Sequence, residues 1–417
     1  MRTAIAVRIF VLLGTYKYFE VMKMMRNFRK KAFKFFIIVL CFCCLFTSKI
    51  YAAPSSKEDD NTDSDSLNLD CKSAILMEAD TGAVLYEKNA DEALPPASVT
   101  KIMTLLLVME AIEEGKISYT DTVSASAHAC SMGGSQIYLR ENEEMSVEDL
   151  LKSVVIASAN DAAVALAEYV CGTEDAFVAK MNEKAKSLGM NNTNFENTNG
   201  LDDTVQNHII SARDIAIMSR ELIKYPKITE YSSIWMDTIR NGEFGLTNTN
   251  RLIRFYKGAT GLKTGSTDKA GFCISATAKR DGMNLICVVM GAETRDVRNA
   301  IATKLLDYGF NNYRIFKSES QTVKNIPVSY GVKENFSAEY KNVSMIVPKE
   351  TGKISAGVHI NENIKAPIKK GDVVGVVSYT DGKKEICRVD IISSENVDRC
   401  SIGSLFGLFL KKCSIIL

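Results

Sequence analysis

The sequence predicts an α/β fold, with one antiparallel sheet covered by helices in a first domain and a small all-β domain after it. Hairpin patterns stand at both ends of the first domain, in residues 72–88 and 272–290. Helical patterns fill the interval between them, and a further helix is expected over residues 297–308. Beyond residue 316, short strand-like runs alternate with turn residues.

Each hairpin has two apolar runs around a short polar turn. Residues 74–78 and 83–87 flank Asp80-Thr81-Gly82, while residues 272–278 and 283–290 flank Arg280-Asp281-Gly282. Because these strands come from opposite ends of one domain, we expect them to meet in a single sheet. The first domain is therefore predicted to span residues 68–316.

The second domain is predicted over residues 317–395. Its expected strands are separated by turns such as Lys370-Gly371-Asp372 and cover residues 343–347, 357–360, 373–379 and 386–392. Nothing in this part of the sequence suggests catalysis.

The N-terminal region has the pattern of an export signal. Basic residues between Lys23 and Lys34 precede the apolar stretch 35–46, and Ala52-Ala53 offers small residues for cleavage. A membrane-spanning helix needs roughly 20 apolar residues, so this stretch is too short for one. We expect a signal peptide within residues 1–52, and we expect translation to start at Met22, Met24 or Met25. Residues 53–67 are expected to be an acidic, disordered leader.

Composition excludes some functions. Without residues 1–52 the chain carries 41 Lys and Arg against 49 Asp and Glu, which argues against a nucleic-acid partner. The cysteines have neither the spacing of a zinc site nor that of a small disulfide scaffold. No metal or organic cofactor is therefore predicted.

The tail, residues 400–417, has an amphipathic helical pattern. Its apolar face holds Ile402, Leu405, Phe406, Phe409, Cys413 and Ile416. Such a helix either lies in a membrane interface or docks on the protein core, and the pattern alone does not decide between these two.

Three short motifs carry the candidate chemistry, and the first is Ser98-Val99-Thr100-Lys101. It opens the apolar run 102–109, which reads as the start of a buried helix. Residues three apart share a helix face, so the Ser98 hydroxyl and the Lys101 amine can meet. A serine needs a neighbouring base to become a nucleophile, and a lysine can be that base if burial and nearby positive charge favour its neutral form. Taken alone, the same residues also fit a helix cap beside a surface lysine.

The second motif, Ser158-Ala159-Asn160, falls at a break between helical segments. There Ser158 can pass a proton between Lys101 and the leaving group, while the Asn160 amide can hold a peptide group of the substrate. An ordinary helix cap is the alternative for this motif taken alone.

The third motif is Lys263-Thr264-Gly265, followed by Ser266. Gly265 allows another backbone to approach an edge strand closely, so a substrate paired along that edge would present its carboxylate to Lys263 and Thr264. Arg251 and Arg254 are further candidates for the same carboxylate. The chain's three histidines, His128, His208 and His359, lie in no evident catalytic triad.

The three motifs, in this order and at this separation, resemble those of the low-molecular-mass penicillin-binding D-alanyl-D-alanine carboxypeptidases. Connecting segments agree with that family as well, notably 137–139, 146–151, 156–163 and 270–272. Two positions depart from it. Ala159 stands where many relatives have glycine, and Ser266 stands where several have histidine or an aromatic residue. Both changes leave the reaction intact and bear on substrate preference.

The resemblance implies a serine β-lactamase-like fold with the catalytic cleft between the sheet and an all-helical part. It implies release of the terminal D-alanine from peptidoglycan pentapeptide stems through an acyl-enzyme on Ser98, with the backbone amides of Ser98 and Ser266 as oxyanion donors. β-Lactam antibiotics would acylate the same serine. The resemblance also favours the membrane-surface reading of the tail, and so an exported enzyme on the outer face of the cytoplasmic membrane.

Two other functions are compatible with parts of this pattern. A serine β-lactamase would share the three motifs, although no Glu-x-x-Leu-Asn segment is present to position a deacylating water. A non-catalytic wall-binding protein would not need them.

Overall fold

The computed structural model describes residues 67–203, 205–382, 384–401 and 403. The predicted signal peptide lies outside the described residues, as do nearly all of the predicted leader and of the amphipathic tail. No helix within the described ranges is both long and apolar enough to cross a bilayer.

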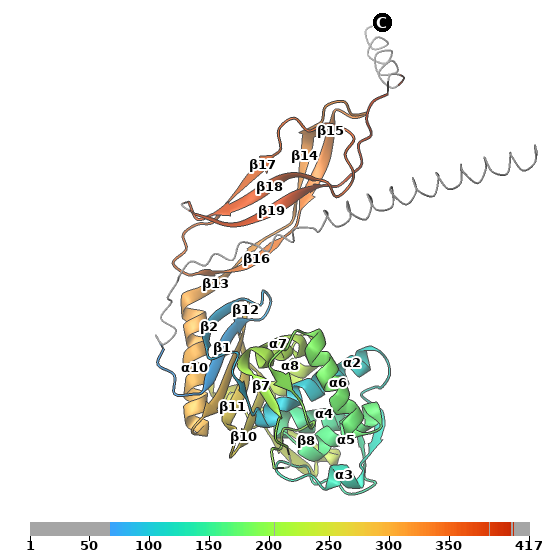
Figure 1. Cartoon of the computed structure of the whole chain (residues 1–417), viewed down its shortest axis with the longest axis vertical. Helices are drawn as coiled ribbons and strands as arrows, with labels where there is room; N and C mark the ends of the chain where they lie inside the picture. Colours follow the sequence, from blue (N-terminus) through green and yellow to red (C-terminus); the bar gives the residue numbers. More distant parts are fainter. Residues whose placement is uncertain (1–66, 204, 383, 402, 404–417) are drawn as a thin grey trace, which may run out of the picture. The chain divides into compact units, whose positions relative to one another are not determined.

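The main sheet is antiparallel and combines strands from both ends of the first domain, as the hairpin patterns predict (Figure 1). Its strands, in spatial order, are β10 (Ala259–Thr267), β11 (Gly271–Arg280), β12 (Met283–Ala292), β1 (Ser73–Glu78) and β2 (Val84–Lys88). Strand β1 pairs with β12, where Ser73 faces Met290. This pairing leaves β10, which carries the third motif, at one edge of the sheet.

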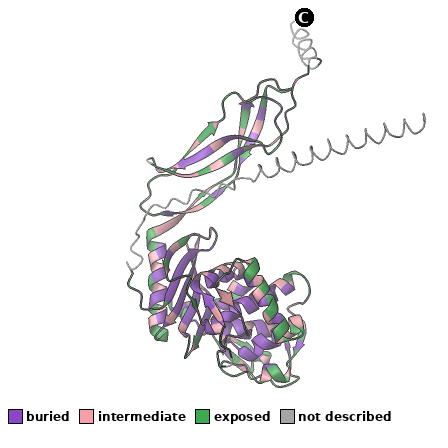
Figure 2. Ribbon diagram, in the orientation of Figure 1, coloured by how far each residue is buried: buried purple, intermediate pink, exposed green. Residues whose placement is uncertain are grey.

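Helices cover both faces of this sheet. Because side chains alternate along a strand, Ala74 and Leu76 pack on one face with α10 (Arg295–Asn312), while Ile75 and Met77 belong to the core of the helical part on the other. Figure 2 shows the resulting burial of the sheet. The fold class predicted from the sequence is confirmed.

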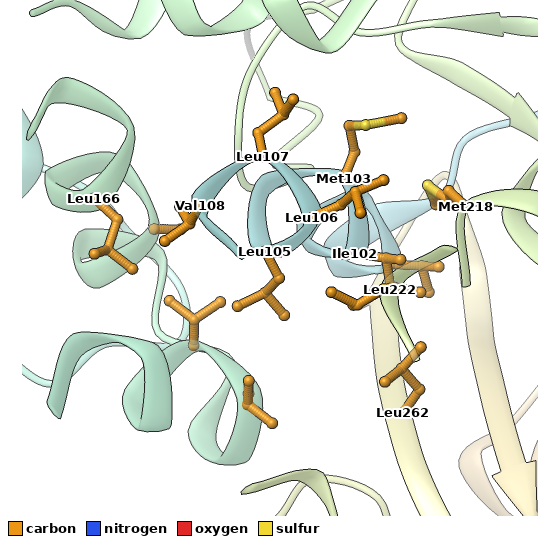
Figure 3. Packing of buried hydrophobic residues seen from close by; sticks show 14 of the residues in the cluster. Ile102, Met103, Leu105, Leu106, Leu107, Val108, Leu166, Met218, Leu222 and Leu262 are labelled. Atoms are coloured by element: carbon orange, nitrogen blue, oxygen red, sulfur yellow. The ribbon is translucent and has the colours of Figure 1, made fainter. Parts of the chain in front are cut away.

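The helical part is built around α2 (Lys101–Glu113). The helix is apolar on nearly all sides and is enclosed by α5 (Asn160–Cys171), α7 (Ala212–Leu222) and strand β10. Figure 3 shows this packing, with contributions from Ile102, Met103, Leu105, Leu106, Leu107, Val108, Leu166, Met218, Leu222 and Leu262. Burial on all sides fixes the start of α2, and hence the first motif, against the sheet edge.

Shorter elements complete this domain. The remaining helices are η1 (Ala97–Thr100), α3 (Ala127–Cys130), α4 (Val147–Lys152), the π-helical turn η2 (Ser153–Ala157), α6 (Glu174–Ser187), α8 (Pro226–Ser232), η3 (Arg240–Gly242) and α9 (Leu252–Phe255). Three small sheets are formed by β3 (Ala93–Leu94), β7 (Ile209–Ser211) and β6 (Thr193–Asn194), by β4 (Thr122–Ser124) and β5 (Glu144–Ser146), and by β8 (Met236–Ile239) and β9 (Phe244–Thr247).

The C-terminal domain is all-β, as predicted, and has its own apolar core. Its five-stranded sheet has the order β14 (Gln321–Pro327), β15 (Asn335–Tyr340), β19 (Glu385–Ser393), β18 (Val373–Thr380) and β17 (Ser355–Ile360). A separate pair joins β13 (Tyr313–Ser318) to β16 (Val343–Pro348). Strands β13, β14 and β15 were not predicted. Polar and charged residues interrupt the apolar pattern in β14 and β15, where only some side chains are buried.

Candidate active site

The structure places Ser98 and Lys101 in direct contact. Ser98 lies on η1, immediately before α2, and Lys101 is the first residue of α2. The Lys101 Nζ donates a hydrogen bond to Ser98 Oγ at 2.9 Å. The lysine side chain is fully buried, so the surface-lysine alternative does not apply.

Two further oxygen atoms hold the Lys101 amine. Asn160 Oδ1 and the Asn199 carbonyl oxygen both accept from Nζ, the second at 2.8 Å. Burial lowers the pKa of Lys101 well below its ordinary value, the nearby charge of Lys263 lowers it further, and Asp161 opposes the shift. A neutral lysine has two N–H groups and one lone pair. When the two N–H groups bond to Asn160 and Asn199, the lone pair is left for the Ser98 proton.

The second motif lies at a helix break, as the sequence predicts. The π-helical turn η2 ends at Ala157 and is followed by Ser158, which adopts a left-handed conformation with φ of 63°, and α5 begins at Asn160. Ser158 lines the same cleft as Ser98. The Asn160 side chain accepts from Lys101 and donates from Nδ2 to the Gly133 carbonyl oxygen at 2.7 Å. In this structure its amide therefore positions the lysine, whereas the sequence suggested contact with the substrate.

The third motif lies on the edge strand β10. Thr264, Gly265 and Ser266 line the cleft, and Thr264 Oγ1 bonds to Thr249 Oγ1 at 2.7 Å. A Cβ atom on Gly265 would lie 2.7 Å from the Ser98 backbone nitrogen. The glycine thus permits β10 to approach the turn that carries Ser98, a segment of the same chain. It also brings strand β10 beside the Ser98 amide.

Lys263 is fully buried next to this strand edge, and its Nζ donates to the Thr264 carbonyl oxygen at 2.9 Å. Burial, with a smaller contribution from the Arg298 charge, lowers the pKa of Lys263 to about 7. A bound carboxylate would favour its charged form.

The cleft has a volume of about 630 Å³. Ser98, Ser158, Thr264, Gly265 and Ser266 line it, together with other residues that include Ser135, Trp235, Arg251, Arg254, Arg295 and Arg298. Arg251 and Arg254, which the sequence suggested as carboxylate ligands, both line this cleft. A second Ser-x-x-Lys pattern runs from Ser266 to Lys269. It differs from the first, because its Lys269 donates to the Asp202 carbonyl oxygen at 2.5 Å. No cluster of potential metal ligands occurs in the described part of the chain.

Several residues at the site were not found from the sequence. Asn199 contributes only its backbone carbonyl, so its side chain gives no signal. Asp161 is buried and accepts from the amides of Ile137 and Leu139, which fixes the loop between α3 and β5. Its position directly after the second motif was the one feature of the sequence that could have indicated its place at the site.

His208 is the third such residue. Its Nδ1 accepts from the Glu196 amide at 2.9 Å, and its Nε2 lies 2.8 Å from Thr100 Oγ1. Thr100 Oγ1 in turn donates to the carbonyl oxygen of Ala97, the residue before Ser98. Ala97 has a positive φ of 49°, which is uncommon for a residue with a side chain. This chain of bonds supports the turn that presents Ser98.

A serine–lysine pair in a cleft between an antiparallel sheet and a helical part is typical of serine enzymes that transfer acyl groups. Comparison with known families specifies the class. The model of the D-alanyl-D-alanine carboxypeptidase family matches residues 59–294, and that of the penicillin-binding protein 5 C-terminal domain matches residues 310–399. The chain therefore belongs to the D-alanyl-D-alanine carboxypeptidase family, and it is a serine-type carboxypeptidase.

Named relatives and solved structures agree. The chain is 43% identical to D-alanyl-D-alanine carboxypeptidase DacF of Bacillus subtilis, over 86% of this chain and 93% of the relative. It is 34% identical to DacC of Escherichia coli, over 88% and 91%. Penicillin-binding protein 5 of Haemophilus influenzae has a similar structure, with a TM-score of 0.71 and 33% identity over 79% of this chain and 98% of that one.

Proposed function

We propose that Ser98 attacks the carbonyl between the two terminal D-alanines of a peptidoglycan pentapeptide stem, releases the last residue, and forms an acyl-enzyme that water hydrolyses. The observation that carries this assignment is the buried Lys101 amine, 2.9 Å from Ser98 Oγ, with its pKa lowered by burial and by Lys263. A base in this state takes the hydroxyl proton as the serine attacks.

The leaving amine needs a proton as the amide bond breaks. Ser158 lines the cleft beside Ser98, so its hydroxyl can relay the proton from Lys101 to the departing nitrogen. Asn160 keeps the lysine in place through this cycle by accepting one of its N–H groups. Once the proton has passed to the departing amine, Lys101 is neutral again and can act as the base for the attack of water on the acyl-enzyme.

Substrate recognition is assigned to strand β10. Lys263 and Thr264 bind the terminal carboxylate, while Gly265 and Ser266 offer backbone to a substrate aligned along the strand. The amides of Ser98 and Ser266 act as the oxyanion donors. The close approach of Gly265 to the Ser98 nitrogen supports this pairing. Removal of one such donor typically costs about 3 kcal/mol in the transition state.

The same serine accounts for β-lactam binding. Attack on the lactam carbonyl opens the ring, but the amine stays tethered to the acyl group and blocks the approach of water. A penicillin therefore serves as a covalent label for Ser98.

The test uses Ser98→Ala with Ser266→Ala as its control, because Ser266 begins the second Ser-x-x-Lys pattern. Labelling by a fluorescent penicillin and release of D-alanine from a diacyl-lysyl-D-alanyl-D-alanine peptide should both vanish in Ser98→Ala. The control should still be labelled. Labelling of a folded Ser98→Ala protein would overturn the assignment.

We also propose that the enzyme is exported and acts at the outer face of the cytoplasmic membrane, in cell-wall biogenesis and maintenance of cell shape. The signal pattern in residues 1–52 supports export, and the amphipathic pattern in residues 400–417 supports attachment to the membrane surface.

A further inference from the structure

Arginines gather at one side of the candidate active site. Arg251 and Arg254 come from the segment around α9, and Arg295 and Arg298 come from the first turns of α10. All four line the same cleft as Ser98 and Thr264. A carboxypeptidase that binds a single terminal carboxylate through Lys263 and Thr264 does not need so many further cations.

Only some of these arginines form hydrogen bonds or ion pairs with other groups of the protein. Arg298 is buried and donates to the Cys273 carbonyl oxygen and the Asn299 side chain. Among the ion pairs formed by described residues, Arg251 has a long one of 3.8 Å to the exposed Asp296, and Arg254 and Arg295 have none. The Arg254 guanidinium lies over the Trp235 ring, 5.6 Å from its centre. That stacking orients the side chain and leaves its edge free for an anion.

Charge effects connect Lys101 to the buried cations Lys263 and Arg298, and connect Arg298 to the exposed arginines. Lys263 is close enough to Lys101 to lower the pKa of that lysine, and Arg298 acts in the same way on Lys263. Burial and then the charge of Arg295 lower the pKa of Arg298 to about 10, with a smaller effect from Arg251. If Lys263 takes the terminal carboxylate, the exposed arginines lie on the side of the leaving residue.

We propose that Arg251, Arg254 and Arg295 form a leaving-group subsite for a second carboxylate, carried by the side chain of the residue that departs from the D-alanyl carbonyl. This inference rests on the proposed function and goes beyond it, because the departing D-alanine has no second carboxylate and the subsite would admit acidic departing residues as well. The chemistry is unchanged: the amide C–N bond breaks, the Ser98 ester forms, the departing amine takes the proton, and water hydrolyses the ester. The subsite adds a preference for an acidic departing residue.

The test compares diacyl-lysyl-D-alanyl peptides that end in D-alanine, D-glutamate or D-glutamine. The last two match in size and differ in charge. Charge-assisted hydrogen bonds in a partly desolvated cleft should favour D-glutamate over D-glutamine by about five- to tenfold in kcat/KM at low salt, and less at high salt. In the double variant Arg254→Gln, Arg295→Gln this ratio should fall to about one.

Both substituted arginines are exposed, and loss of a cation at Arg295, in the first turn of α10, does not oppose the helix dipole. The variant should therefore fold. The double variant Lys369→Gln, Lys370→Gln, at an exposed turn of the all-β domain, is the matched loss of two positive charges and should keep the D-glutamate preference.

The outcomes separate the two levels of the proposal. Equal rates on D-glutamate and D-glutamine in the wild-type protein, with D-alanine release intact, overturn the subsite alone. A preference that persists in the double variant overturns its assignment to these arginines. Absence of both penicillin labelling and D-alanine release in the wild-type protein overturns the proposed function, and the subsite with it.

Discussion

Lys101 joins three segments that are distant in the sequence. Its amine contacts the nucleophile turn, the start of α5 and the Asn199 carbonyl, and its burial excludes the water that would otherwise stabilise a charge. Burial of an amine away from water, without a full counterion, favours its neutral form over the ammonium ion. The environment of this residue thus lowers its pKa and favours the neutral amine that a general base requires.

Lys263 should control the pH at which this base works. Its charge lowers the pKa of Lys101, so Lys263→Gln should raise that pKa and move the acid limb of the penicillin acylation profile to higher pH. The sign follows because acylation needs neutral Lys101, which protonates as the pH falls. Stopped-flow acylation rates across the acid and neutral range measure the shift.

Lys269→Gln is the matched control, since Lys269 bonds to the Asp202 carbonyl and is not among the charges that shift Lys101. An acid limb that stays at the wild-type pH in Lys263→Gln, although the overall rate falls, would argue against Lys101 as the base.

Thr100 should act on catalysis through the backbone before Ser98. Because the Glu196 amide donates to His208 Nδ1, the ring carries its proton on Nε2 and donates to Thr100 Oγ1. Burial lowers the pKa of His208 to about 4, so the ring is neutral in ordinary buffers. Thr100→Val breaks this chain and leaves a buried N–H unsatisfied, which should cost about 1–3 kcal/mol of stability. We expect roughly tenfold slower acylation, a further loss of about 1.4 kcal/mol in the transition state.

Thr100→Ser keeps the hydroxyl and should restore the acylation rate, even where the lost methyl lowers the melting temperature. Normal acylation by Thr100→Val would show that the hydrogen bonds stabilise the fold without positioning Ser98.

The sequence predicted the residues of the candidate site better than their contacts. The spacing of Ser98 and Lys101 was enough to place them together, because a helix repeats every 3.6 residues. The partners of Asn160 were not predictable, since its amide meets Gly133 and Lys101 only after the chain folds. A backbone carbonyl such as that of Asn199 is present at every position and leaves no pattern to read.

At the scale of elements, the main sheet was predictable because its strands alternate between two buried faces and end at clear turns. The strand β14 was not, because it buries only Ile326 and depends on pairing for its stability. Strand β15 alternates buried Phe336, Ala338 and Tyr340 with polar residues, a pattern that the prediction missed. The helix break at Ser158 was evident in the sequence, but its π-helical turn was not.

The contact between β10 and η1 gives a prediction about Gly265. An alanine there would place its Cβ 2.7 Å from the Ser98 nitrogen and 2.9 Å from the Val99 nitrogen, which are backbone atoms that cannot rotate away. We expect Gly265→Ala to separate the strand from the nucleophile turn, abolish measurable acylation, and cost about 1–3 kcal/mol in stability.

Gly245→Ala, on strand β9, is the control, because nothing lies within 4 Å of its added Cβ and its backbone is not left-handed. It should retain full penicillin labelling. Wild-type acylation in Gly265→Ala would mean that the turn relaxes without harm, and would weaken the assignment of the Ser98 and Ser266 amides as a fixed pair.

At the scale of the whole molecule, the catalytic and all-β domains have separate apolar cores. The composition change near residue 316 reflects this, because helical periods give way to short alternating strands. The strand β13, which begins at Tyr313, pairs with β16 of the C-terminal region. Such a pairing joins residues about thirty positions apart, so a local pattern does not reveal it.

The tail gives the last prediction. If residues 402–417 hold the mature protein to the membrane by an apolar helix face, their removal should release an active enzyme. The chain should be cut after Ser401. The Cys400 amide donates to the Tyr330 carbonyl oxygen at 2.8 Å and Arg399 forms a β-bridge with Gly331, so a shorter chain would disturb the all-β domain.

Each large apolar side chain buried in the interface contributes roughly 1.5 to 3 kcal/mol. The double replacement Leu405→Glu, Phe409→Glu should therefore have the same effect as the cut, whereas Lys411→Gln, off the apolar face, should weaken binding only slightly. Sedimentation with vesicles and hydrolysis of a small peptide measure the two properties. Truncated protein that still sediments with vesicles would refute the anchor, and loss of peptidase activity without a change in vesicle binding would show that the tail instead supports the enzyme.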